Sequence, residues 1–181
     1  MGGILLYALL SRCGLQGMDS GLASFTTIAS TLDYSSSGTL LKYLLPVKEP
    51  AQAINLPALP IDTILAMAHP LICRPAYALS CLCTVPAKLL FQLATAVDQG
   101  GLRDRTGNFY YKDHISKTSV PILALAVYDT VKLIPEHLAT FKVLGSPGGP
   151  HYGHQDMISG RTARSEIYPL IIQYLQRHDE R

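Results

Sequence analysis

The sequence predicts a mixed α/β domain built on a parallel sheet of about three strands. Short runs rich in apolar and β-branched residues, at 25–30, 120–126 and 139–144, alternate with helical segments. The run at 120–126 is apolar throughout, which is typical of a strand buried on both faces of a sheet. Alternation of strands and helices favours a parallel sheet, because parallel neighbours need a crossover connection, usually a helix.

The chain opens on a helical segment. Residues 4–13 are apolar nearly all round, which indicates a buried helix that begins at the glycine pair Gly2–Gly3. Gly14 and Gly17 are expected to end it. Its wide apolar face is expected to comprise Ile4, Leu5, Ala8, Leu9 and Cys13.

The first predicted strand follows this helix. Phe25–Ser30 is short and rich in Phe, Thr and Ile, as strands are. Residues 33–38 contain three serines and predict a turn. Residues 39–45 predict a short helix that stops at Pro46, because proline cannot continue a helix.

Residues 46–111 differ in character from the rest of the chain. Prolines recur here between short apolar helical pieces such as 61–68 and 87–97. The pattern predicts an irregular helical insertion, a lid or cap, between an opening core segment at 1–45 and a C-terminal core at 112–181.

The C-terminal segment contains the two remaining strands, at 120–126 and 139–144. Residues 127–133 predict a helix that ends near Pro135, and residues 145–154 form a loop rich in glycine and proline. A terminal helix is expected at 164–177. Its predicted inner face comprises Ile167, Leu170, Ile171, Tyr174 and Leu175.

Composition argues against several functional classes. The 181 residues are 48% hydrophobic and only 15% charged, which excludes a disordered chain and suits a piece of a larger core. The net charge of +2 is scattered, so no nucleic-acid surface is expected. The longest apolar region, 64–93, is interrupted by prolines and cations, so no transmembrane helix is expected.

The cysteines give no sign of a metal site. Cys13, Cys73, Cys81 and Cys83 lack the paired spacing that zinc requires, and we expect neither a metal nor a cofactor. Buried, reduced thiols are the simpler interpretation, and they indicate a reducing compartment such as the cytoplasm or a plastid.

Two short motifs bear on chemistry. The chain opens Met1-Gly2-Gly3 directly before the apolar helix, and residues 148–156 read G-G-P-H-Y-G-H-Q-D. A histidine in a loop after the last strand can sit over the strand ends, and its pKa suits proton transfer near neutral pH. With both motifs, the chain resembles plant α/β-hydrolases related to acid lipases, over nearly its whole length.

The resemblance implies roles for specific residues. Met1 would follow the nucleophile of a G-x-S-x-G turn, its amide forming half of the oxyanion hole, and Gly2 would close that turn. His154 would be the catalytic base, with His151 as the second candidate, although either histidine could simply hydrogen-bond the loop. The serine itself is absent and is expected just upstream of Met1.

The resemblance also leaves the acid of the triad in doubt. Relatives have a loop of about ten residues, of G-D-x-D type, after the strand that corresponds to 120–126. Here that strand runs directly into the segment containing Asp129, the nearest acid, which falls within the expected helix 127–133.

Three functional hypotheses follow. In the first, the chain is the C-terminal part of a serine ester hydrolase whose intact parent acts on a small apolar ester, and the chain itself has negligible activity. In the second, it is a non-catalytic protein that self-associates through an exposed sheet edge and the apolar face of residues 4–13. In the third, the chain does not fold stably alone.

Overall fold

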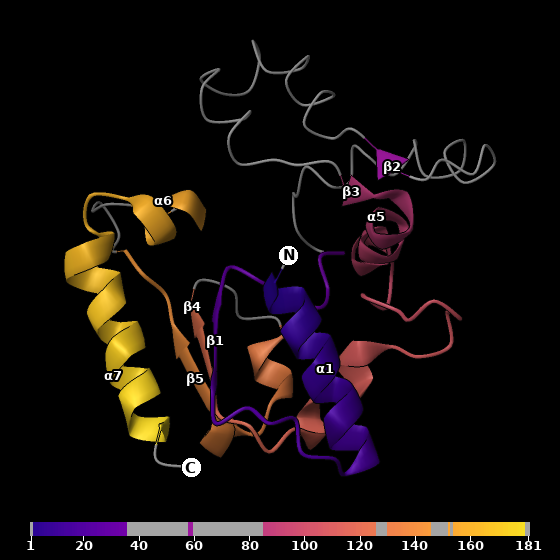
Figure 1. Ribbon diagram of the computed structural model, residues 1–181, viewed down its shortest axis with the longest axis horizontal. Helices are drawn as coiled ribbons and strands as arrows, with labels where there is room; N and C mark the ends of the chain where they lie inside the picture. Colours follow the sequence, from indigo (N-terminus) through magenta and orange to yellow (C-terminus); the bar gives the residue numbers. More distant parts are fainter. Residues whose placement is uncertain are drawn as a thin grey trace.

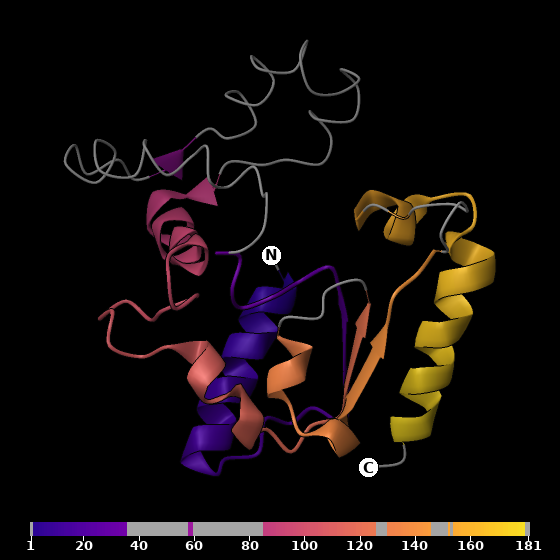
Figure 2. The same ribbon diagram turned by 180° about the vertical axis from the view of Figure 1, so that it is seen from behind.

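The computed structural model describes residues 2–35, 58–59, 85–125, 130–145, 152 and 154–179. Its main sheet lies between helix α1 (Gly2–Gln16) and helix α7 (Tyr168–His178), as both ribbon views show (Figures 1 and 2). The remaining helices are α5 (Ala87–Ala94), α6 (His154–Ser159) and a π-helical turn (Ala163–Ile167). Short 3-10 turns are η3 (Thr95–Val97), η4 (Tyr111–Asp113), η5 (Ile115–Lys117), η6 (Val131–Leu133) and η7 (Glu136–Leu138).

The sheet confirms the predicted parallel α/β class. Strands β1 (Phe25–Ile28), β4 (Ile122–Leu125) and β5 (Ala139–Lys142) are all parallel, in the order β1-β4-β5. The central strand β4 is buried along its whole length, which explains the continuous apolar run in its sequence. A separate antiparallel pair joins β2 (Ala58–Leu59) and β3 (Val85–Pro86).

Each face of the sheet has its own hydrophobic core. On the α1 side, Phe25 and Ile122 pack with Tyr7 and Leu10 of α1. The same core includes residues of the predicted insertion, namely Leu93, Ala96, Leu102 and Tyr111. On the α7 side, Leu123 and Leu125 pack with Met157, Ala163, Ile167 and Tyr174. The two cores are therefore separated by the sheet.

The predicted strands are present but shorter than expected. The first ends at Ile28 rather than Ser30, because Ala29 adopts a left-handed backbone with φ +48°. The second begins at Ile122 and is described to Leu125, and the third ends at Lys142 rather than Leu144. Each of these shortenings removes two residues and leaves the order of the strands unchanged.

The expectations for the first helix were partly wrong. The helix continues through Gly14 to Gln16, and only Gly17, with φ +64°, ends it. It is also not buried all round, since Leu5 is 51% exposed and Leu9 is 40% exposed. The buried face comprises Ile4, Tyr7, Leu10, Ser11 and Cys13.

The later helices also depart from the sequence pattern. The helix expected at 127–133 is described only as the 3-10 turn η6, and residues 126–129 lie outside the described ranges. The terminal helix forms as a π-turn followed by α7, and Leu175 is exposed rather than on the inner face. The segment 87–97 is helical as predicted and forms α5 and η3. The helices predicted at 39–45 and 61–68 lie outside the residues that the structure describes.

Three further observations concern membrane-spanning helices, cysteines and metal ions. No helix within the described ranges has the length and apolar character needed to cross a bilayer. Cys13 is buried and unbridged, and the other cysteines fall outside the described residues. The described part of the chain holds no cluster of three or more side chains suited to a metal ion.

Candidate functional site

The carboxyl edge of the sheet is the natural place for a site in this fold. In open parallel sheets, ligands bind in the crevice outside the carboxyl ends of the strands. Here the N-terminal end of α1 and helix α6 both lie at that end of the sheet, as the two ribbon views agree (Figures 1 and 2). The loops that leave β1 and β4 emerge at the same edge.

The start of α1 is pressed closely against the end of β1. A Cβ atom added to Gly3 would lie 2.5 Å from Ser30 Oγ and 2.8 Å from Thr27 Oγ1, so only glycine fits without a shift. Gly2 is different, because a Cβ there would meet nothing within 4 Å. The close approach between the start of α1 and the end of β1 is therefore at Gly3 and not at Gly2.

Few of the residues predicted to be catalytic fall within the described ranges. Met1, Asp129 and His151 lie outside them. His154 is the first residue of α6, so the expected loop ends one residue earlier than predicted, and its side chain lies outside the description. Asp156, two positions on in the same helix, is exposed.

Helix α6 is held on the α7 side of the sheet. Met157 is 1% exposed and packs with Leu123 and Leu125 of β4. Just before the helix, the Tyr152 hydroxyl donates to Glu166 and accepts a hydrogen bond of 3.1 Å from Thr162 Oγ1. The bond to Glu166 raises the pKa of Tyr152. These contacts join Tyr152 to the π-helical turn and pack α6 against β4 on the α7 side of the sheet.

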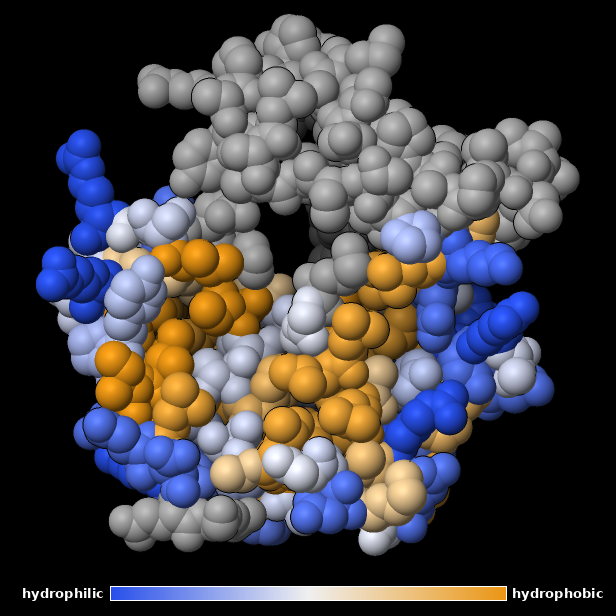
Figure 3. All heavy atoms as spheres, viewed as in Figure 1, coloured by the Kyte–Doolittle hydropathy of each residue, from blue (hydrophilic) through white to orange (hydrophobic). Residues whose placement is uncertain are grey.

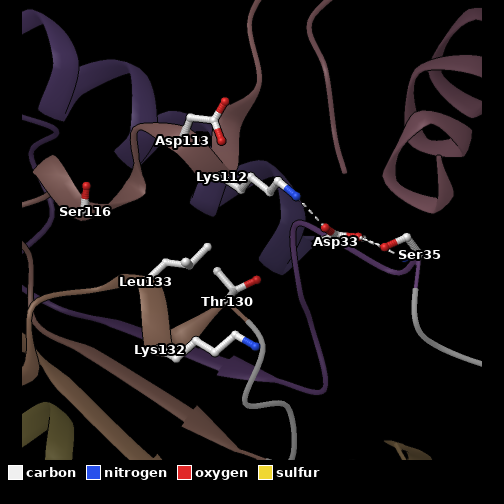
Figure 4. Close-up of a pocket in the computed structure, with 8 residues that line it drawn as sticks. All are labelled: Asp33, Ser35, Lys112, Asp113, Ser116, Thr130, Lys132 and Leu133. Atoms are coloured by element: carbon white, nitrogen blue, oxygen red, sulfur yellow. Dashed lines mark hydrogen bonds and ion pairs between the residues drawn. The ribbon is translucent and has the colours of Figure 1, made fainter. Parts of the chain in front are cut away.

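A pocket of about 420 Å³ lies beside the loops that follow β1 and β4 (Figure 4). Seven of the eight lining residues within the described ranges are polar or charged, and none of the eight is a histidine or a cysteine. They are Asp33, Ser35, Lys112, Asp113, Ser116, Thr130, Lys132 and Leu133.

An ion pair forms one side of this pocket. Lys112 Nζ donates to Asp33 Oδ2 at 2.8 Å, and Asp33 Oδ1 accepts from the amide and the hydroxyl of Ser35 at 2.9 and 2.5 Å (Figure 4). Burial of the Asp33 carboxyl opposes its ionisation, but the bonds from Lys112 and Ser35 outweigh burial and lower its pKa. Asp33 therefore remains a carboxylate whose main contacts lie within the protein.

Two buried threonines fasten the loop after β1 to the segment after β4. The hydroxyls of Thr31 and Thr130 lie 2.6 Å apart, and the Leu32 amide donates to Thr130 Oγ1 at 2.7 Å. Thr31 is 2% exposed and Thr130 is 1% exposed. The bonds fix the backbone immediately before Asp33.

Among the described residues, the pocket and helix α6 adjoin different hydrophobic cores. Leu32, next to Asp33, belongs to the core on the α1 side, whereas Met157 of α6 belongs to the core on the α7 side. The pocket can bind polar groups through hydroxyls and ammonium groups, but its lining offers no nucleophile paired with a histidine.

Sequence reasoning missed Lys112 and Thr130. The sequence predicts a turn at Asp33 and a helix at Thr130. The partners of the ion pair, Asp33 and Lys112, are separated by 79 positions. No local pattern marks such pairs, because they form only when segments that are far apart in the sequence meet in the fold.

Comparison with known proteins adds no family to this picture: no protein-family model, no curated protein and no solved structure matches the chain.

Proposed function

We propose that this chain forms the C-terminal part of an α/β-hydrolase fold, of the serine ester hydrolase type, with residues 46–111 as a helical lid. The observation that supports the proposal best is the arrangement at the carboxyl edge. Helix α1 begins there at Gly2, with Gly3 pressed against Ser30 and Thr27, and the chain returns there after β5 at the start of α6. A nucleophile turn and a histidine loop need this arrangement.

In this proposal His154 is the proton acceptor and donor, and the substrate is a small apolar ester. Residues 1–181 contain no G-x-S-x-G sequence, so none of their serines is assigned as the nucleophile. Loss of a triad member typically lowers turnover by about 10⁴–10⁶. The 181-residue chain alone is therefore expected to hydrolyse esters negligibly.

Fluorophosphonate labelling of the endogenous product tests this assignment. The product would be captured with an antibody against residues 168–181, treated with the probe, digested and mapped by mass spectrometry. We expect no labelled serine within residues 1–181. A label on a serine that precedes Met1 in a longer product, lost in the His154→Ala variant, would support the family. A label within residues 1–181 would contradict the proposal.

The second candidate function is self-association without catalysis. Two features favour it within the described chain. Strand β1 is an edge strand, since the sheet order is β1-β4-β5. Leu5 and Leu9, one turn apart on α1, expose apolar surface, and Figure 3 shows apolar side chains gathered over α1 and over the region of α6 and α7. Such surfaces favour association.

Sedimentation velocity over a hundredfold range of concentration tests this candidate. We expect the wild-type sedimentation coefficient to rise with concentration and the Leu5→Glu/Leu9→Glu variant to remain monomeric. Val143→Glu is the matched control, because Val143 is 70% exposed after β5, away from α1. A wild-type monomer at every concentration would remove this candidate.

A further inference from the structure

A second groove lies on the other side of α1 from α6, between α5 and the turn at 104–107. Its volume is about 640 Å³. Leu89 and Phe91 of α5 line it together with Pro86, and all three contribute apolar surface. None of the described residues at the carboxyl edge lines this groove.

The rim of the groove carries an excess of positive charge. Lys88, Arg103 and Arg105 line it, against the single acid Asp104. Arg103 is paired with Asp98 at 2.5 Å, and Asp104 is paired with Arg12 of α1 at 3.4 Å. In the described part of the chain, Lys88 and Arg105 have no ion-pair partner, so two cations remain uncompensated at the rim.

The turn that presents Arg105 is held by hydrogen bonds before any ligand binds. Asp104 Oδ1 accepts from the amide and the hydroxyl of Thr106, at 3.1 and 2.8 Å, and from the Phe109 amide at 3.4 Å. These bonds lower the pKa of Asp104, with the Thr106 hydroxyl as the largest cause. Gly107 takes φ +79°, which allows the chain to turn back.

The opposite wall of the groove, formed by α5 and η3, is hydrogen-bonded to Arg103, which directly precedes the same turn. Thr95 Oγ1 accepts from the Arg103 amide at 3.0 Å, and Gln92 Nε2 donates to the Arg103 carbonyl at 3.5 Å. Arg103 Nε is buried and has no hydrogen-bond partner among the described residues. The groove is therefore preorganised, which lowers the entropic cost of binding a ligand.

We propose that this groove binds a small amphiphilic anion, with one anionic head at Lys88 and Arg105 and a short unbranched apolar tail along Phe91 and Leu89. Charge selects the head, because the two uncompensated cations attract one anionic group and repel a cationic one. Apolar burial selects the tail. The proposal uses neither His154 nor the ester hydrolase assignment, and it stands if that assignment fails.

Isothermal titration of the full 181-residue chain with monomeric decanoate, below the concentration at which it forms micelles, tests the proposal. We expect saturable binding to one site. Decanol, with the same tail and no charge, should bind at least tenfold more weakly. Binding of decanoate should weaken as salt increases, because the contacting charges lie at an open rim.

Two substitutions locate the site. Arg105→Ala and Lys88→Ala should each weaken decanoate binding by roughly tenfold, as expected for loss of one charge-assisted hydrogen bond. Arg164→Ala is the control, because Arg164 is an exposed cation in the π-helical turn beside α7. Both groove residues are exposed, so the variants should keep the wild-type melting temperature.

Three outcomes would overturn the proposal. The first is no saturable binding of decanoate. The second is equal binding of decanoate and decanol, or equal binding by wild type and Arg105→Ala. The third is binding to phosphatidylcholine vesicles that contain phosphatidylserine without binding to monomeric decanoate, which would assign the cations to a membrane surface instead.

Discussion

Buried hydroxyl groups differ sharply in how well this protein satisfies them. Thr31 and Thr130 bond to each other and to the backbone, whereas the buried hydroxyl of Tyr174 has no partner among the described residues. An unpaired buried polar group costs free energy, and a paired one contributes modestly. Substitutions at these positions should therefore have opposite effects.

Thr130→Val should destabilise the fold by about 1–3 kcal/mol, because it leaves the Leu32 amide and the Thr31 hydroxyl buried without their partner. Thr130→Ser keeps the hydroxyl and removes one methyl group, so its cost should not exceed about 1 kcal/mol. Urea denaturation measures both free energies of unfolding. Equal losses in the two variants would show that the hydroxyl contributes no more to stability than the methyl group does.

Tyr174→Phe should leave the free energy of unfolding at neutral pH unchanged or raise it, because the hydroxyl that it removes is buried and unpaired. Burial raises the pKa of Tyr174 to about 12 from its ordinary value of 10.0. The folded state thus holds the phenol proton more tightly than the unfolded state. The free energy of unfolding should therefore fall as the pH rises from 10 towards 12, because the phenol then loses its proton in the unfolded state but keeps it in the folded state.

The variant should lose the part of this alkaline limb that Tyr174 contributes, which unfolding curves between pH 9 and pH 12 would reveal. Burial also raises the pKa values of Tyr7 and Tyr34, so these two residues should keep their own share of the limb in the variant. Tyr168→Phe is the control, because Tyr168 is exposed and its hydroxyl donates to the Ile158 carbonyl. The control retains Tyr174 and should keep the wild-type pH dependence. An identical limb in Tyr174→Phe would show that other groups titrate there.

At the scale of elements, the sequence was most informative about the strands. Their apolar, β-branched runs predicted three strands in the right places, and the apolar run at 120–126 predicted the buried centre of the sheet. Helix ends were harder to predict. Gly14 looked like a terminator, but its missing side chain serves packing between α1 and η5, which a local pattern does not reveal.

Gly14→Ala should destabilise the protein by about 1–3 kcal/mol, the usual cost of overpacking. Its Cβ would lie 2.6 Å from the Lys117 carbonyl oxygen and 2.9 Å from the Thr118 amide nitrogen, and backbone atoms cannot rotate away. Gly2→Ala makes the same change in the same helix with nothing within 4 Å, so it should be within about 0.5 kcal/mol of wild type. Thermal or urea unfolding compares the two, and equal effects would show that η5 moves freely away from α1.

At the scale of the whole molecule, the sequence predicted the class of fold but only part of the site. The motifs around Gly3 and His154 could be found because they are local, and both segments lie at the carboxyl edge. The Asp33–Lys112 pair and the groove beside α5 could not be found, because each joins segments far apart in sequence. The exposed Leu5 and Leu9 were misjudged because periodicity shows that a face is apolar, not whether anything covers it.

Hydrolysis of 4-nitrophenyl acetate by the purified 181-residue chain tests the central claim most directly. The comparison is between wild type, His154→Ala and His137→Ala, where His137 is exposed in η7 and far in sequence from α6. We predict the same low background rate for all three, because no serine in the chain is assigned as a nucleophile for His154 to activate. A rate that His154→Ala abolishes and His137→Ala retains would contradict the account, since the chain would then contain its own nucleophile.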